Sequence, residues 1–316
     1  MPRARRRTSV SSSARFRPRF VGERLQLELK RFPSIWATYP FVMWTGRPPV
    51  TEVTDPPEIS AVLRRVRIDA GAVDRYARMC GFDPAAGLPL TYPHVLAMPL
   101  HLKIFGNRAF PLRPMGLIHL SNSIECPGLL PPGLEVDVHV VSRNYQRTDA
   151  GLSFDMATEI KVDGEARWRE NCVFLSRWPE PLERTGARPP RPPRAPKDAA
   201  VLAEFDVTRD TAWAYAKVSS DFNPIHLSER AARFFGLRGA ISHGMWSLAC
   251  SLAQAPLPYI PPGTRLETQF LTPVQLPARV AVKEWTADGQ KKRALCDVRT
   301  GRVHMYAWWE EISRPA

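Results

Sequence analysis

Residues 219–236, SSDFNPIHLSERAARFFG, place a carboxylate and an imidazole at a spacing that suits proton transfer. Asp221 and His226 stand on either side of Asn223-Pro224. An imidazole with a pKa near ~6.5 exchanges protons at neutral pH, and a carboxylate can orient or share that work. Pro224 restricts one φ angle and Asn223 can hydrogen-bond to nearby backbone, so both side chains should have little freedom. The stretch predicts an acid–base pair on a rigid turn.

Each of these residues also has a structural interpretation. Asp221 and Asn223 could simply cap a helix, and a single histidine such as His226 is often a hydrogen-bonded structural residue. Ser228 is predicted to cap a short helix that stops at Gly236. The residue types alone leave both interpretations open.

A second motif, Ser242-His243-Gly244, opens a long apolar run, and His243 lies seventeen residues after His226. If a buried helix begins at Gly244, its free N–H points outward at the positive end of the helix dipole, and glycine lets a carbonyl approach closely. His243 is expected to hydrogen-bond at the helix start, with substrate contact as the less favoured alternative. A zinc site built from Asp221, His226 and His243 lacks a recognisable ligand spacing, so neither metal nor cofactor is expected.

The segments that must position these motifs occur twice along the chain. Each half opens with a helix-compatible stretch, at 70–82 and 208–220, followed by a run that is apolar on all sides, at 92–105 and 242–255. A helix that is hydrophobic all round belongs in the middle of a fold.

Short strands end each half. Between Leu134 and Val140, apolar residues alternate with polar ones, which is the period of a half-buried strand. Hairpin turns follow at similar spacings: Gly151 and Gly164 are 13 residues apart, and Gly289 and Gly301 are 12 apart. An internal duplication explains both patterns. It predicts one buried helix and one antiparallel sheet, built twice and joined as an intrachain pseudo-dimer.

The first half lacks the acid–base pair. Aligning Tyr76 with Tyr215 puts Phe82 opposite Asp221, and the segment that follows Phe82 is too short to hold a second Asn-Pro-x-His loop and its helix. The first half is therefore predicted to be non-catalytic.

The boundary between the halves is a Pro- and Arg-rich connector at 178–200, whose prolines favour an extended chain with little to bury. The predicted divisions are a basic tail and extension at 1–56, a first repeat at 57–177, the connector, and a second repeat at 201–316. Within the extension, residues 32–44 are apolar but interrupted by Pro33 and Pro40, and are expected to form a packed loop or short strand.

The motif from Ser219 to His226, with Ser242-His243-Gly244, resembles the signature of the MaoC-like hydratases and dehydratases, which have the hotdog fold. Ser220 stands where that family usually has glycine, and Ser242 where alanine is common. Ser220 could alter the backbone if its position needs a positive φ. The first half, with LPLTYPHVLAMPLHL and PMGLIHLSNSIECPG, is similar to the N-terminal repeat of mycobacterial-type double-hotdog (3R)-hydroxyacyl dehydratases.

The resemblance implies an α+β double hotdog, in which each sheet wraps a long central helix. It implies a hydro-lyase of fatty-acid metabolism that reversibly adds water to a trans-2-enoyl thioester of coenzyme A or acyl carrier protein. The catalytic residues would be Asp221, His226 and Gly244. The supporting residues would be Asn223, Pro224, Ser242 and His243.

Two alternatives remain. A hotdog thioesterase is one, although such enzymes usually carry a carboxylate on the central helix and 243–255 has none. A non-catalytic acyl-thioester-binding subunit is the other, and the presence of both Asp221 and His226 argues against it.

Substrate-binding residues are less well defined by the sequence. Leu96, Met98 and Leu100 could line the path of an acyl chain in the first half, and core packing explains them equally well. Arg233 and Arg238 could bind the phosphates of coenzyme A or an acidic carrier protein.

The charge distribution argues against nucleic acid as a partner. The net charge is +13, but the tail at 1–22 contributes +7 and the stretch 177–199 contributes +3, leaving +3 for the rest of the chain. The basic residues therefore gather in a tail and a connector instead of on a folded face.

The five cysteines are far apart and form no C-x-x-C motif, which is typical of free thiols in a reducing compartment. A cytoplasmic protein is expected, with organelle targeting by the Arg- and Ser-rich N-terminus as the minor alternative. No stretch is long and apolar enough to be expected to span a membrane. Whether the pseudo-dimer pairs further is open.

Overall fold

We describe the fold from a computed structural model, which defines residues 24–43, 46–128, 130–179, 194–254 and 264–311. The basic tail up to residue 23, most of the connector (180–193) and residues 312–316 lie outside this range. The element order divides into a short N-terminal portion and two halves of similar composition.

A single eleven-stranded sheet runs through the molecule, and its strand order shows the duplication. The order is β1-β2-β4-β5-β6-β3-β8-β11-β10-β9-β7, so the second half repeats the first in reverse. The halves join where β3 pairs antiparallel with β8, as at Ile124 opposite Leu266. The strands of the first half are β2 (Glu58–Arg67), β3 (Ile118–Glu125), β4 (Glu135–Thr148), β5 (Gly151–Val162) and β6 (Glu165–Arg177). Those of the second half are β7 (Ala200–Val207), β8 (Thr264–Phe270), β9 (Ala278–Ala287), β10 (Gln290–Asp297) and β11 (Val303–Glu311).

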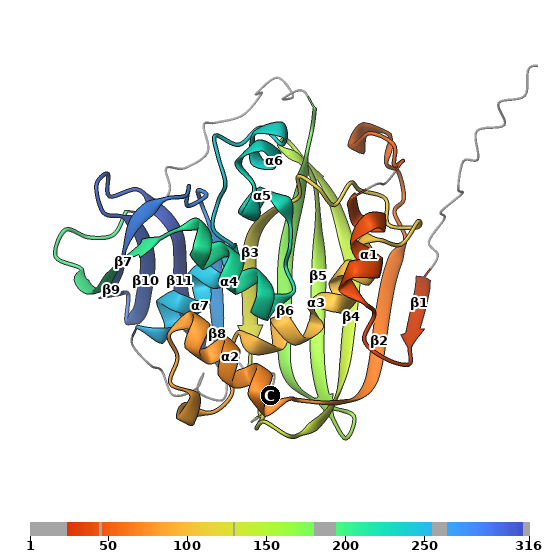
Figure 1. The fold of residues 1–316 in the computed structure, drawn as a ribbon, viewed down its shortest axis with the longest axis horizontal. Helices are drawn as coiled ribbons and strands as arrows, with labels where there is room; N and C mark the ends of the chain where they lie inside the picture. The colour runs from red at the N-terminus through yellow and green to blue at the C-terminus, as the bar shows by residue number, and fades with distance from the viewer. Residues whose placement is uncertain (1–23, 44–45, 129, 180–193, 255–263, 312–316) are drawn as a thin grey trace, which may run out of the picture.

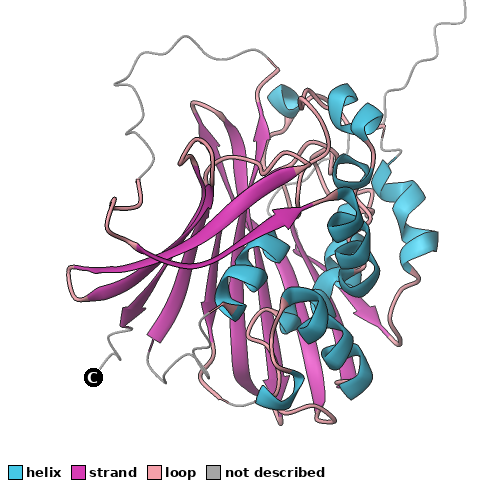
Figure 2. Cartoon of the chain, turned by 60° about the vertical axis from the view of Figure 1, so that its left-hand side comes forward, coloured by secondary structure: helices cyan, strands magenta, loops and turns pink. Residues whose placement is uncertain are grey.

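The helices lie against one face of this sheet (Figure 2). The central helices are α3 (Tyr92–Phe105) and α7 (Gly244–Ala253), and each is preceded by a more amphipathic helix, α2 (Ala70–Cys80) or α4 (Arg209–Ser219). Tyr76 of α2 and Tyr215 of α4, the two residues aligned from the sequence, are both buried, with ring centroids 6.2 Å apart. The short helices α5 (Pro224–Leu227) and α6 (Glu229–Phe234) occur only in the second half, and 3-10 turns lie at Val50–Glu52 and Pro84–Ala86.

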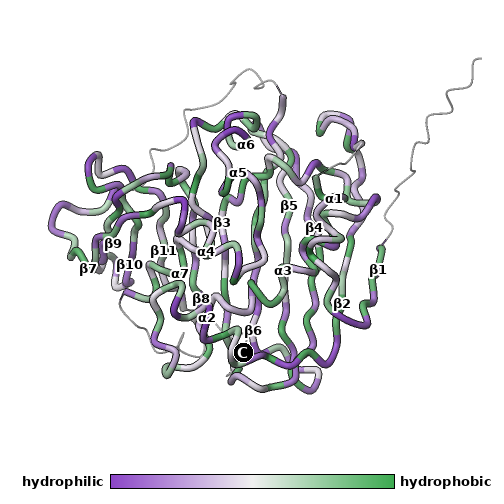
Figure 3. Tube along the Cα trace, viewed as in Figure 1, coloured by the Kyte–Doolittle hydropathy of each residue, from purple (hydrophilic) through white to green (hydrophobic). Residues whose placement is uncertain are grey.

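The predicted strand patterns are present in the sheet. Along β4, Val136, Val138 and Val140 are buried while the residues between them are more exposed, and hydrophobic and hydrophilic residues alternate along the trace (Figure 3). At the hairpins, Asp163-Gly164 and Asp288-Gly289 have positive φ at both positions, the conformation of tight hairpin turns. These observations confirm the expected α+β double hotdog.

The N-terminal portion departs from what its sequence suggested. Residues 35–43 form a helix, α1 (Ile35–Met43), where a loop or short strand was expected. Pro33 and Ser34 precede the helix, and Ser34 Oγ accepts a hydrogen bond from the Ala37 N–H at 3.3 Å in its first turn. Pro40 lies inside α1 and removes one backbone hydrogen bond there. Ahead of it, β1 (Arg24–Leu29) adds a parallel edge strand beside β2, so the wholly antiparallel expectation does not hold there.

None of the helices in the described part of the chain has the length and apolarity that crossing a membrane would require.

One buried arginine ties the second central helix to the sheet. Arg293 on β10 is 1% exposed, and its Nη1 donates to the carbonyl oxygens of Ser251 at 2.9 Å and Leu252 at 3.3 Å. Its Nη2 bonds Glu284, its partner across the β9–β10 ladder. Arg293 thus satisfies carbonyl groups at the end of α7 that the helix itself leaves unpaired.

Replacing Arg293 by methionine should lower the free energy of unfolding by about 3 kcal/mol, because the carbonyl groups of Ser251 and Leu252 would lose their buried donor. Glu284 would keep its second partner, Lys291, at 3.6 Å. The measurement is denaturant unfolding of both proteins. Arg279→Met is the matched control: Arg279 pairs with Glu204 and Asp206 on the surface, where its side chain is 56% exposed, and its loss should cost less than about 1 kcal/mol. Equal effects of the two substitutions would contradict this role for Arg293.

Candidate active site

The turn between α4 and α5 positions Asp221. α4 ends at Ser219, and Ser220 adopts the left-handed conformation with φ of 62°, which explains why glycine is usual there in the family that the motif resembles. Asp221 Oδ1 accepts a hydrogen bond from the Asn223 N–H at 3.2 Å. Asn223 Oδ1 in turn accepts from the Ile225 N–H at 3.3 Å, which makes Asn223 the N-cap of α5. The turn is therefore held by its own side chains.

His226 lies on α5, two residues after Pro224 has begun the helix. The residue is 8% exposed, and Nδ1 of its imidazole lies 2.9 Å from the carbonyl oxygen of Ile241. Because a carbonyl oxygen only accepts, Nδ1 carries the proton. In the neutral ring Nε2 is then unprotonated and available as a base.

His243 bridges the turn and the second central helix. It stands at the N-cap position of α7, and its Nε2 donates to the backbone carbonyl oxygen of Asp221 at 3.0 Å. Its ring stacks on His226 with centroids 3.8 Å apart. The preceding residue, Ser242, donates its N–H to the carbonyl oxygen of Val274 at 2.9 Å and so anchors the segment.

Asp221, His226 and His243 converge. One carboxylate oxygen and one nitrogen of each ring lie within 4.8 Å of one another. Burial opposes ionisation of Asp221 most strongly, but His243, His226 and the Asn223 N–H together hold the pKa of Asp221 below its usual value. Burial lowers the pKa of His226, with Asp221 acting in the opposite direction, and burial lowers the pKa of His243 to about 3. At neutral pH the site holds a carboxylate beside two neutral imidazoles.

Gly244 is the first residue of α7, so its N–H has no acceptor within the helix. A Cβ at this position would lie 3.2 Å from Cε1 of Phe270, at the end of β8. Phe270 in turn packs against His119 of β3, with ring centroids 4.7 Å apart. The head of α7 therefore faces the seam between the two halves.

The first half contributes a buried polar network that the sequence did not lead us to expect. His94 on α3 binds Glu170 on β6, with Nδ1 2.8 Å from Oε2, and Asn122 Nδ2 donates to Oε1 of the same carboxylate at 2.6 Å. Burial lowers the pKa of His94, but Glu170 outweighs it, so the net shift is upward. Burial likewise opposes ionisation of Glu170, and His94 outweighs it to lower that pKa. The two therefore form an ion pair.

A signal for this network was present in the sequence. His94 and His101 stand within the otherwise apolar run at 92–105, and a buried histidine needs a hydrogen-bonding partner. The partner of His94, Glu170, lies 76 residues away, and only the packing of α3 on β6 brings it near.

Among the described residues, two clusters bring three potential metal-ligand atoms together: His94, Glu170 and Cys172, and Asp221, His226 and His243. Hydrogen bonds already engage one nitrogen of each histidine: His94 and His226 through Nδ1, His243 through Nε2. The expectation that neither metal nor cofactor is needed remains a prediction.

The weaker substrate-binding candidates are scattered. Leu96 and Leu100 are buried in the core on one face of α3, whereas Met98, half-buried, lies on the opposite face of the helix. The three residues therefore do not line a single path. Arg233 and Arg238 are exposed around α6, where Arg233 pairs with Glu229 at 3.4 Å.

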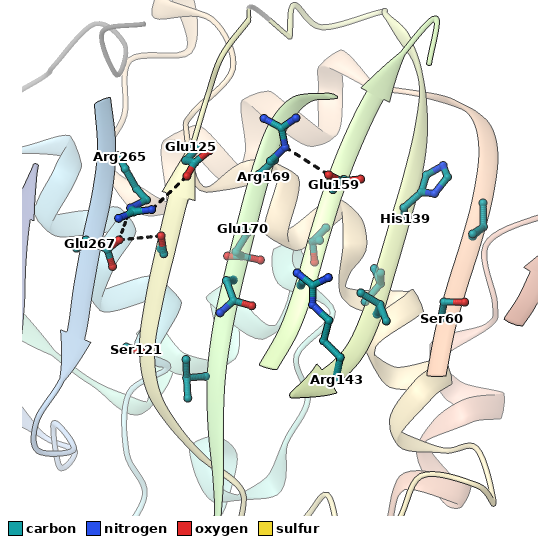
Figure 4. Close-up of a pocket in the computed structure, with 18 of the residues that line it drawn as sticks. Ser60, Ser121, Glu125, His139, Arg143, Glu159, Arg169, Glu170, Arg265 and Glu267 are labelled. Carbon is teal, nitrogen blue, oxygen red and sulfur yellow. Dashed lines mark hydrogen bonds and ion pairs between the residues drawn. The ribbon is translucent and has the colours of Figure 1, made fainter. Parts of the chain in front are cut away.

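A cavity of about 720 Å³ lies elsewhere, on the face of the sheet that the helices do not cover (Figure 4). Charged residues of its lining pair with one another, as in Arg265 with Glu125 at 3.4 Å and Arg169 with Glu159 at 3.3 Å. Neither Asp221 nor His226 lines this cavity.

Comparisons with known proteins agree with the geometry. Residues 186–306, which contain the whole turn and α7, match the family model described as a MaoC like domain. The chain is 31% identical over 264 residues to 3-hydroxyacyl-thioester dehydratase X of Mycobacterium tuberculosis, covering 83% of this chain and 93% of that protein.

Solved structures show the same fold. The crystal structure of HtdX from M. tuberculosis superposes with a TM-score of 0.68 at 28% identity, covering 80% of this chain and all of that one. A MaoC-like dehydratase from Phytophthora capsici superposes with a TM-score of 0.63 at 17% identity, covering 84% of this chain and 98% of that one. From the fold, the converging site and these similarities together, the chain belongs to the MaoC-like dehydratase family.

Proposed function

We propose that this chain is a hydro-lyase that interconverts trans-2-enoyl and (3R)-hydroxyacyl thioesters. The observation that carries the proposal is the convergence of an ionised Asp221 and a neutral His226 on His243, the residue that precedes the Gly244 amide at the head of α7. The similarity to a protein named 3-hydroxyacyl-thioester dehydratase supports the same substrate class.

In the hydration direction, Asp221 and His226 hold the attacking water. The unprotonated Nε2 of His226 accepts one proton of the water, and the Asp221 carboxylate accepts a hydrogen bond from the other O–H. The water oxygen then forms its bond to C3 of the enoyl thioester. The hydrogen bond from His226 Nδ1 to Ile241 holds the ring in the tautomer that this step needs.

The electrons of the C2–C3 double bond move toward the thioester carbonyl as water adds. The N–H of Gly244, at the positive end of α7, would stabilise the negative charge on that oxygen. The proton taken from water then goes to C2 from the acid–base pair, so both residues return to their starting states. Dehydration is the same path in reverse.

We assign the supporting roles from the contacts of the site. Asn223 and Pro224 shape the turn, Ser242 anchors the segment before α7, and His243 ties the turn to that helix.

The first half would accommodate the acyl chain along α3, where Leu96 is among the apolar residues available. Coenzyme A or acyl carrier protein would be the thioester carrier, with the exposed Arg233 and Arg238 as candidates for its phosphates or acidic groups. All five cysteines are unpaired, which agrees with a reducing compartment such as the cytoplasm.

Two other functions are less well supported. A thioesterase of this fold would be expected to carry a carboxylate on its central helix, and neither α3 nor α7 contains one. A non-catalytic acyl-binding subunit would have no need of a carboxylate and an imidazole held this close together.

The test is to follow the loss of conjugated enoyl absorbance when the purified protein meets trans-2-enoyl-CoA substrates of several chain lengths. Asp221→Asn and His226→Gln should each lower kcat by about 10²- to 10⁴-fold, the range expected for losing an acid–base group. Asp210→Asn on the surface of α4 and His139→Gln on the opposite face of the sheet are matched controls that should keep full activity. Release of free coenzyme A without hydration, or full activity in both site variants, would contradict the proposal.

Gly244→Ala should lower kcat/KM by about 10²-fold, because the added Cβ would press on the Phe270 ring at 3.2 Å and shift the head of α7, which moves the amide away from the thioester oxygen. The control is Gly239→Ala, where a Cβ meets nothing within 4 Å and the backbone is not left-handed. The measurement is kcat/KM of both variants from steady-state kinetics. Equal values would show that the Gly244 amide does not stabilise the thioester oxygen.

The pH dependence should follow the lowered pKa of His226. The neutral imidazole is the active form, so activity falls only when pH drops through this pKa, which lies below the ordinary value of about 6.5. The kcat/KM value should thus stay level through neutral pH, and its acid limb should lie below the range of an ordinary imidazole. An acid limb centred above pH 7 would show that His226 is not the base.

A further inference from the structure

Helix α1 belongs to neither half of the duplication, yet it lies against the turn that carries Asp221. The hydroxyl of Tyr39 donates a hydrogen bond to the carbonyl oxygen of Ser220 at 3.3 Å and accepts one from the N–H of Phe222 at 2.5 Å. The two bonded backbone groups belong to the residues immediately before and after Asp221. One side chain from 181 residues away thus spans the peptide groups on both sides of the carboxylate-bearing residue.

Aromatic packing reinforces this contact. The Phe222 ring lies 4.8 Å from the ring of Trp36 and 6.4 Å, edge to face, from that of Tyr39. α1 is itself fixed, because Thr38 and Val42 are buried and the helix packs on α3 (Figure 1). Packing on α3 therefore ties the Tyr39 hydroxyl to the body of the first half.

The turn needs such support from outside. Ser220 holds a left-handed conformation that a residue with a Cβ adopts at a cost in free energy. The hydrogen bonds within the turn are all local. They run from the Asn223 N–H to Asp221 and from the Asp221 N–H to Ser219 Oγ, the latter at 3.2 Å. His243 and Tyr39 are the residues that bind the turn from α7 and α1, one at the carbonyl of Asp221 and one at its neighbours.

We propose that Tyr39 is a positioning residue for the reaction: its hydroxyl sets the orientation of Asp221 by binding the backbone on both sides of it. This inference rests on the proposed hydration activity. Tyr39 touches neither substrate nor reacting atoms in this account and acts only through the turn.

The Tyr39 hydroxyl is protonated at neutral pH, as a hydrogen-bond donor to the turn must be. Burial most of all, followed by the charge of Asp221, raises the pKa of Tyr39 well above its usual value, so the group stays protonated and keeps its donor. Phenylalanine at this position would keep the ring and its contact with Phe222 and lose both hydrogen bonds.

The experiment compares Tyr39→Phe with the unchanged enzyme. We expect kcat for enoyl-CoA hydration to fall by about 10- to 100-fold, the scale of a misplaced catalytic group, with KM changing less than about twofold. Hydrogen exchange of the backbone amide of Phe222, followed in the substrate-free protein, should become faster at the same time. This second readout does not depend on the activity.

Tyr145→Phe is the matched control. Its hydroxyl donates to Ser142 Oγ at 3.2 Å on β4, so the same chemical change removes one hydrogen bond at a distance from the turn. The control should leave kcat and the exchange of Phe222 unchanged. An unchanged kcat in Tyr39→Phe would overturn the proposal, and so would unchanged exchange at Phe222.

A loss of activity shared equally by both variants would also overturn it, since the effect would then be a general loss of stability. An unaltered protein that fails to hydrate any enoyl thioester would refute the proposed function itself. Faster exchange at Phe222 would in that case still show that Tyr39 holds the turn, which separates the two failures.

Discussion

Two hydrogen bonds from histidine rings to backbone carbonyl groups hold the site together. His243 at the head of α7 binds the carbonyl of Asp221, and His226 on α5 binds the carbonyl of Ile241, just before α7. Each bond crosses between the turn and the segment that leads into the second central helix. As a result, the carboxylate, the imidazole and the amide of Gly244 are positioned by one connected unit. The same bonds determine the tautomer of each ring, so the geometry and the proton chemistry have a common origin.

Burial completes this arrangement. A buried imidazole resists protonation, whereas the hydrogen bond from the Asn223 N–H and the two neighbouring rings keep Asp221 ionised. A base that is neutral and a carboxylate that is charged are both what water activation requires near neutral pH. In the first half the histidine is charged instead. The carboxylate of Glu170 raises the pKa of His94, and His94 lowers the pKa of Glu170, so the two form an ion pair. The two clusters thus have different charge states: His94 is hydrogen-bonded to its carboxylate, whereas His226 and His243 are hydrogen-bonded to backbone carbonyl groups.

The duplication explains why the two halves can differ so far. The pairing of β3 with β8 continues the sheet across the seam, and one hydrophobic core includes residues of both halves. The turn with Asp221 and His226 lies in the second half alone. The first half has neither α5 nor α6. The space over its central helix is instead occupied in part by α1, which comes from the N-terminal portion and contacts the turn of the second half. The extension has therefore become part of the surroundings of the site.

Much of this could be read from the sequence because it depends on local chemistry. The apolar run at 92–105 predicted α3, and the Asp-Gly pairs predicted the hairpins. The order Asp221, Asn223, Pro224, His226 predicted a turn that brings a carboxylate and an imidazole together. Helix α1 was missed because Pro33 and Pro40 weaken the local signal, and packing on α3 outweighs one lost hydrogen bond. Tyr39 and Glu170 could not be predicted at all, since each acts on residues 76 or more positions away.

The sequence by itself determined which side chains share the turn, because their order and spacing along a few residues dictate the local geometry. Only the tertiary structure decided their protonation states and their support. Burial, ring stacking and hydrogen bonds to distant backbone arise from contacts between segments, and no local pattern encodes the distance across such a contact.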